Sequence, residues 1–96
     1  MDFVFEIIDK TGRKIHLSKE RWTHIRLKHP NVENSESIID TILNSDKIVK
    51  IEEDIIAYYK YFKHRKEPLK YLNVIVKYLN GNGYVVTSYF VRNILL

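Results

Sequence analysis

One predicted helix, residues 19–28, carries three nitrogen bases close together. Ser18 is placed to cap its first turn. At about 100° per residue, Arg21, His24 and Lys28 fall within an arc of about 60°. Histidine gives and takes protons near neutral pH, so His24 between two cations predicts a general base or acid. The alternative is a solvated basic face, as on most charged helices.

The neighbouring side of the same helix is expected to pack against the rest of the domain. Trp22, Ile25 and His29 share that side. Because His29 precedes Pro30, the helix should end there. We interpret His29 as a hydrogen-bonded structural histidine.

The histidines do not form a metal motif. His24 and His29 point roughly 140° away from each other on a helix, and His16 and His64 belong to other elements. The glycine-rich stretch at residues 81–83 joins two strands instead of opening a helix, so it is no phosphate-binding loop. We therefore expect neither a metal ion nor another cofactor.

The elements that must position this helix form a single predicted domain. Residues 3–8 and 13–17 read as a hairpin around a turn at residues 9–12. A second helix presents an apolar stripe and is interpreted as structural; the stripe consists of Ile38, Ile39, Ile42 and Leu43. Four strands follow, at residues 47–52, 55–62, 70–79 and 84–91. We therefore expect an α+β fold over residues 1–96: an N-terminal β-hairpin, two helices and a four-stranded antiparallel sheet.

Alternation assigns the two faces of the last two strands. The more apolar sets should cover the helices; they are Leu72, Val74, Val76 and Tyr78, and Tyr84, Val86, Ser88 and Phe90. The opposite sets carry Asn73, Lys77, Thr87 and Tyr89, and this face is too polar and aromatic to form a second core. It is a candidate binding surface. For residues 55–62 the alternation does not decide which side chains face the helices.

Aromatic and basic residues on these strands resemble the parts of an RNA-binding platform. Tyr58, Tyr59 and Lys60 lie on one predicted strand, and Thr87 and Tyr89 lie on another. Aromatic rings stack unpaired bases, and cations hold phosphates. The loop that follows the first of these strands adds positive charge from Lys63, Arg65 and Lys66, with His64 as an exposed contact residue. The alternative is that tyrosine's β-propensity alone explains these rings.

Composition favours a cytoplasmic protein with an anionic partner. The 96 residues include no cysteine, which excludes disulfides and thiolate metal sites. No apolar run is long enough to span a membrane. Residues 1–59 hold nine basic and eleven acidic residues, whereas residues 60–96 hold seven and one. This asymmetry favours nucleic acid as the partner.

The order of these parts resembles one nuclease family. The parts are a hairpin, the motif of Glu20, Arg21, Trp22, His24 and Ile25 followed by His29 and Pro30, a second helix, a strand ending in Tyr58, Tyr59 and Lys60, and a final strand with Thr87, Ser88 and Tyr89. Together they resemble the phage-associated branch of the barnase, EndoU, colicin and RelE (BECR) nuclease superfamily. The resemblance implies helices on an antiparallel sheet, metal-independent RNA cleavage and, in many members, a toxin role. It implies that His24, Lys60 and residues 87–89 carry the site. No glutamate stands in an obvious position for the base that barnase-like members use.

The resulting hypothesis is a metal-independent endoribonuclease that uses the ribose 2′-hydroxyl as nucleophile. His24 would be the general base or acid, Lys60 and Arg21 would stabilise the phosphorane, and Thr87 would bond phosphate. The expected substrate contacts are Tyr58, Tyr59, Tyr89, Lys28, Lys63, Arg65 and Lys66. Two alternatives are an RNA-binding module without catalysis and a toxin-like domain whose basic face docks an acidic inhibitor protein. Catalysis requires His24 to lie within reach of Lys60 and Thr87.

Overall fold

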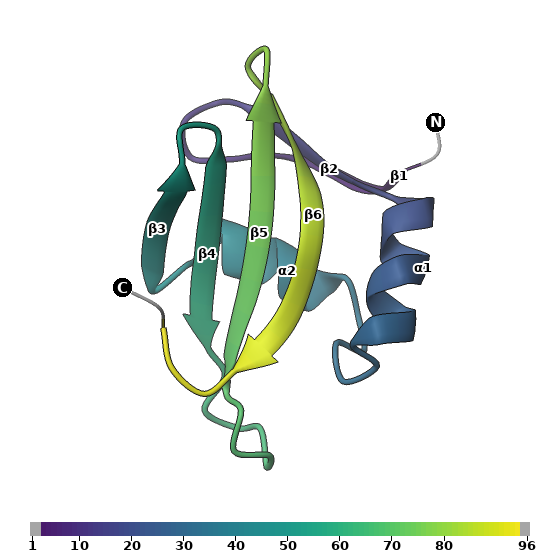
Figure 1. Cartoon of the computed structure of the whole chain (residues 1–96), viewed down its shortest axis with the longest axis vertical. Helices are drawn as coiled ribbons and strands as arrows, with labels where there is room; N and C mark the ends of the chain where they lie inside the picture. Colours follow the sequence, from purple (N-terminus) through teal and green to yellow (C-terminus); the bar gives the residue numbers. More distant parts are fainter. Residues whose placement is uncertain (1–2, 95–96) are drawn as a thin grey trace.

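The computed structural model describes residues 3–94 and has an α+β fold (Figure 1). Two helices and six strands follow each other in the order β1 (Phe3–Ile8), β2 (Lys14–Ser18), α1 (Lys19–Lys28), α2 (Glu36–Leu43), β3 (Lys47–Glu52), β4 (Ile55–Tyr61), β5 (Tyr71–Leu79) and β6 (Asn82–Val91). The hairpin, the first helix and the four later strands lie within two residues of their predicted positions, and α2 contains the whole predicted apolar stripe of the second helix. None of the helices in this part of the chain is long and apolar enough to cross a membrane.

The sheet differs from the prediction of four antiparallel strands. All six strands form one sheet in the order β1-β2-β6-β5-β4-β3. Neighbouring strands are antiparallel except β2 and β6, where residues 14–16 pair in parallel with residues 82–84. The predicted four-stranded antiparallel sheet is therefore only part of the observed sheet, because the N-terminal hairpin extends it through a parallel pair of strands. Alternation within a strand carries no information about a partner nearly 70 residues away, so sequence reasoning could not find this pairing.

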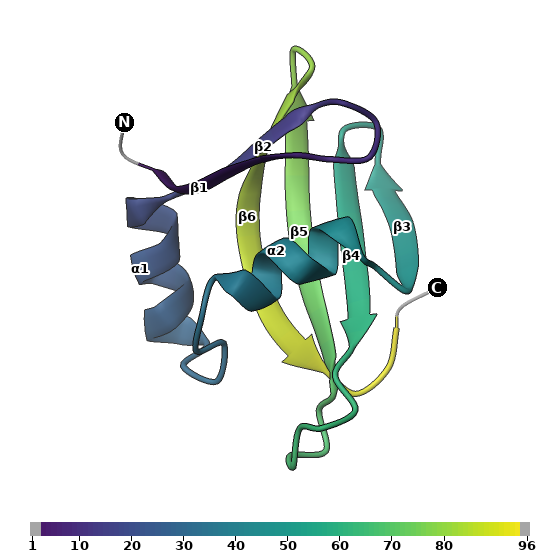
Figure 2. The same ribbon diagram turned by 180° about the vertical axis from the view of Figure 1, so that it is seen from behind.

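Both helices are placed by the hairpin and the sheet. Helix α2 lies across one face of the sheet, against β4 and β5, and the β1–β2 hairpin crosses over on the same side (Figure 2). Helix α1 stands beside β6 at the edge of the four-stranded part. The core lies between α2, the hairpin and the sheet; its fully buried members include Ile15, Leu17, Ile25, Ile38, Leu72, Val74 and Val76. We call the sheet face that points away from α2 the outer face.

A β-bulge changes which residues of β6 face the core. Ile75 pairs with Thr87, but the next residue, Val76, pairs with Val85, so Val86 is the extra residue. After the bulge, Ser88 and Phe90 are buried as expected. Before it, the predicted placement is wrong: Gly83 and Val85 are buried in the positions expected for Tyr84 and Val86.

Local capping explains the accuracy of the helix bounds. The Ser18 hydroxyl accepts a hydrogen bond from the Arg21 backbone N–H at 3.0 Å, as its N-cap position predicts. At the other end, Arg26 Nη1 donates to the carbonyl oxygens of Pro30 and Val32, at 2.6 and 2.8 Å. These two bonds fix the turn that follows α1 and hold His29, its C-cap residue, in place.

Candidate functional site

The basic arc of α1 lies on the outer side of that helix. Arg21 and His24 line a shallow hollow of about 280 Å³ that is formed by α1 residues alone. The side chain of His24 is exposed, as is that of Lys28. The three bases are thus accessible, but no strand contributes to the surface they share.

The structure does not bring His24 together with Lys60 and Thr87. Lys60 pairs with Leu72, which pairs with the buried Phe90, so these three side chains share the face covered by α2. Thr87 is three residues before Phe90 and therefore points to the outer face. Lys60 and Thr87 lie on opposite faces of the sheet, and the hollow beside His24 includes neither.

Tyr58 belongs to the protein interior. It is 5% exposed, and its hydroxyl lies 2.5 Å from that of Tyr78. Tyr78 in turn donates to Asp9 Oδ2 at 3.0 Å. Burial raises the pKa of the Tyr58 hydroxyl. This side chain links the strands to the tip of the hairpin and has no surface on which a base could stack.

Tyr59 and Tyr89 do share the outer face, which alternation in β4 alone did not decide. Lys47, Tyr59, Asn73 and Tyr89 are register partners on four adjacent strands, so they form one row across the sheet, here called the cross-sheet row. Tyr59 and Asn73 are each 2% exposed, so Tyr59, like Tyr58, has no surface on which a base could stack; Tyr89 is half-buried. Thr87 lies on the same face, two residues before Tyr89.

Asn73 contains an unusual polar atom at the centre of this row. Its Oδ1 is buried and has no hydrogen-bond partner among the described residues. An unpaired buried acceptor costs about 1–3 kcal/mol. Such groups are rare in folded proteins and often mark positions retained for a purpose other than stability.

His29 extends the cross-sheet row from β6 to α1. Its ring centroid lies 5.2 Å from that of Tyr89, at an interplanar angle of 40°. Among residues 3–94 its imidazole makes no hydrogen bond, although its backbone N–H donates to the Ile25 carbonyl at 2.7 Å. Sequence reasoning treated His29 as a hydrogen-bonded structural residue. The family resemblance combines the motif that contains His29 with the motif of residues 87–89. That combination was the signal that could have placed His29 in the site.

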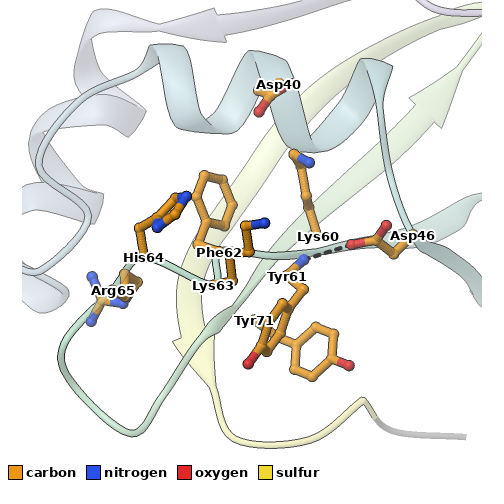
Figure 3. Close-up of a pocket in the computed structure, with 9 residues that line it drawn as sticks. All are labelled: Asp40, Asp46, Lys60, Tyr61, Phe62, Lys63, His64, Arg65 and Tyr71. Atoms are coloured by element: carbon orange, nitrogen blue, oxygen red, sulfur yellow. Dashed lines mark hydrogen bonds between the residues drawn. The ribbon is translucent and has the colours of Figure 1, made fainter.

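A second, larger hollow lies at the far end of β4 (Figure 3). It measures about 810 Å³ and is lined by Asp40, Asp46, Lys60, Tyr61, Phe62, Lys63, His64, Arg65 and Tyr71. We call it the β4-end groove. It brings together three of the cations predicted to contact RNA, namely Lys60, Lys63 and Arg65. Lys66 does not line it.

Arg65 is largely a structural member of this groove. Its guanidinium carbon lies 3.6 Å from the centre of the Phe90 ring, and its Nε donates to the Leu69 carbonyl at 2.9 Å. Its side chain is 17% exposed and pairs with Glu67 at 3.4 Å. The groove's free positive charge therefore comes mainly from Lys60 and Lys63.

Comparison with protein-family models, with curated proteins and with solved structures found no match. The function must therefore be argued from the chain's own residues. Within residues 3–94, no three histidine, aspartate or glutamate side chains gather in a way that could hold a metal ion. The accessible groups of the cross-sheet row and its edge are His29, Thr87, the ring of Tyr89 and Lys47.

Proposed function

We propose that this chain binds single-stranded RNA across the outer face of its sheet and cleaves it through the ribose 2′-hydroxyl. The contact between His29 and Tyr89 carries this proposal. It places a group that transfers protons near neutral pH against an accessible aromatic ring, on the face that also presents Thr87. A base stacked on Tyr89 would hold its ribose and phosphate near both polar side chains.

The reaction assigns a role to each of these groups. His29 takes the proton of the 2′-hydroxyl, whose oxygen attacks the adjacent phosphorus. The bond from phosphorus to the 5′-oxygen breaks, and that oxygen takes a proton from solvent water, giving a 2′,3′-cyclic phosphate and a 5′-hydroxyl. Thr87 donates a hydrogen bond to the phosphate, and Lys47, at the other end of the cross-sheet row, adds positive charge to the bound strand.

In this arrangement His29 takes the role that the helix pattern gives to His24. His24 lies on the outer side of α1, in a hollow lined by that helix alone, whereas His29 faces the sheet. Arg21 lines the same hollow as His24 and therefore has no role in the proposed reaction on the outer face. Lys60 faces the side of α2 and belongs to the β4-end groove.

RNA binding without cleavage is the second candidate. It is favoured by the separation of His24, Lys60 and Thr87, which occupy three different surfaces. The residues that sequence reasoning combined into a catalytic set are therefore not assembled. Binding through aromatic rings and cations needs no such set.

The chemistry of cleavage distinguishes these candidates. The chain has no cysteine, and among residues 3–94 no three histidine, aspartate or glutamate side chains gather in a way that could hold a catalytic divalent ion. We expect purified protein to cut RNA oligonucleotides in excess chelator and to leave 2′,3′-cyclic phosphate ends. Replacing the ribose at the cut site with deoxyribose should stop the reaction. Cutting of DNA, or loss of activity on chelation, would contradict the mechanism, and binding without any cutting would support the second candidate.

A further inference from the structure

The β4-end groove exists because β3 is shorter than β4 at this end. Lys47, the first residue of β3, pairs with Tyr59, so the edge of β4 beyond it has no strand partner. There the Tyr61 backbone N–H donates instead to Asp46 Oδ2 at 2.7 Å. Helix α2 contributes Asp40 on one side, and the loop after β4 contributes residues 63–65 on the other (Figure 3).

The charges of the groove favour an anion. Lys60 and Lys63 form no ion pair with any described residue, and His64 is exposed beside them. The two carboxylates accept hydrogen bonds from neutral groups, Asp46 from the Tyr61 N–H and Asp40 from the Asn44 amide at 2.7 Å. Three cations line the groove against these two carboxylates, and Lys60 and Lys63 can both contact a ligand's negative charge.

Two aromatic rings line the side of the groove that lies opposite Lys60. The rings of Tyr61 and Tyr71 have centroids 5.1 Å apart and are inclined at 59°. Tyr61 is 44% exposed. Figure 3 shows both rings on the other side of β4 from Lys60, so the cations and the rings flank the end of that strand. An exposed ring with a half-buried partner, across this strand end from cations without an ion pair, suits a ligand that combines a flat base with a phosphate.

We infer that the β4-end groove is a subsite for one nucleotide of the RNA strand. Its phosphate contacts Lys60, Lys63 and His64, and its base stacks on the exposed ring of Tyr61, with the inclined Tyr71 ring at the edge of the base. This inference rests on the proposed function for the choice of RNA as the larger ligand. It gives that ligand a direction, because the Tyr61–Tyr71 pair lies two residues, about 7 Å, along the strands from the cross-sheet row. A strand that passes Tyr89 and continues in that direction reaches the groove.

The subsite also restricts the form of the substrate. A base can stack on Tyr61 only if it has left any base pair. The groove therefore selects an unpaired nucleotide on one side of the cleaved bond, within a loop, a bulge or a single strand.

Titration with adenosine 5′-monophosphate, followed by NMR of the ¹⁵N-labelled full chain, tests the subsite directly. We expect saturable shifts of the amides of residues 60–65 and of Tyr71. Removing both free charges, in the double variant Lys60→Gln and Lys63→Gln, should weaken binding by at least about tenfold. The same change of net charge in Lys10→Gln and Lys14→Gln, on the hairpin, should leave the affinity within about twofold. The spectra also show whether each variant is folded.

Two further probes separate the parts of the ligand. Inorganic phosphate and adenosine should each bind more weakly than the nucleotide. Phosphate that binds as tightly as the nucleotide, shifts spread over the whole surface, or an equal loss of affinity in the hairpin variant would overturn the subsite. The nucleotide contains no bond that 2′-hydroxyl attack could cleave, so this result does not depend on whether the protein cuts RNA.

Discussion

His29 and His24 differ in what surrounds them, although both come from one short helical motif. His29 ends α1 against Tyr89, and His24 is exposed on the far side of the helix. We expect His29→Ala to slow RNA cleavage by about 100-fold or more, because it removes the proton-transfer group beside the stacked base. His24→Ala is the matched control and should change the rate by less than about tenfold. Single-turnover rates, with thermal midpoints to verify folding, would measure both. A larger loss of cleavage rate in the His24 variant than in the His29 variant would instead assign the catalytic role to the basic residues of α1.

Asp9 makes stability depend on pH. Its side chain is 4% exposed and accepts hydrogen bonds from Thr11, from the Arg13 backbone and from Tyr78. Burial pushes the pKa of Asp9 upward, but these hydrogen bonds outweigh it and hold the pKa below the usual 3.8. A lowered pKa stabilises the fold above the unfolded-state value. That contribution is lost as the pH falls through the folded-state value.

The variant Asp9→Asn tests this linkage. We expect it to lower the free energy of unfolding at neutral pH by about 1–3 kcal/mol, because a charged acceptor of several hydrogen bonds becomes neutral. The difference from the parent chain should narrow as the pH falls below 3.8. Urea denaturation across this range measures it. A difference that stays constant with pH would assign the loss to altered packing instead of charge.

At the scale of elements, β6 contains a glycine packed closely against Tyr78. A Cβ atom at Gly83 would lie 2.9 Å from Tyr78 Cε1 and 3.0 Å from Val76 Cγ1. We expect Gly83→Ala to destabilise the protein by about 1–3 kcal/mol through overpacking. Gly83 also pairs with Ile15 of β2, so the loss should appear at the parallel junction of the sheet. Denaturant midpoints, together with hydrogen exchange of the β2 amides, would measure it. Unchanged protection of β2 would contradict this location.

The sequence predicts the bounds of the helices and strands better than it predicts which of them contact one another. Ser18 and Pro30 bracket α1, and the turn at Asn80 and Gly81, both with positive φ, separates β5 from β6. These are local signals, and they placed the helix and the hairpin correctly. For the residues of β6 before Val86, the prediction of which side chains face the core was wrong. A bulge interrupts the alternation there, and bulges have no unambiguous residue signature.

The candidate site was predictable in part, for the same reason. Strand alternation puts Thr87 and Tyr89 on one face, and that face is the outer one. The contact of Tyr89 with His29 depends on how α1 docks at the edge of the sheet, and no local pattern encodes that docking. Lys60 was grouped with Thr87 by motif alone, and the register places the two on opposite faces.

At the scale of the whole molecule, charge is distributed unevenly along the chain, and three of the basic residues from its last part line the β4-end groove. Residues 60–96 hold seven of the sixteen basic residues but one of the twelve acidic residues. RNA affinity should therefore fall steeply with salt. Removing the charges of Lys60 and Lys63 should reduce the logarithmic salt slope by about 0.7 for each phosphate that the protein no longer neutralises. Fluorescence anisotropy with a labelled RNA oligonucleotide, repeated at several salt concentrations, measures the slope. Affinity that does not change with salt would count against nucleic acid as the partner.

The parallel pairing of β2 with β6 has a consequence for how the chain is made. The hairpin leaves the ribosome early, yet its only strand partner outside the hairpin, among the described residues, is the last strand to appear. Contacts of such large sequence separation form late in folding. The contact between His29 and Tyr89 also forms late, since His29 caps the first helix and Tyr89 lies in the last strand. A nascent chain therefore has no assembled outer face, and under the proposed function no cleavage activity, until residue 91 is free to pair.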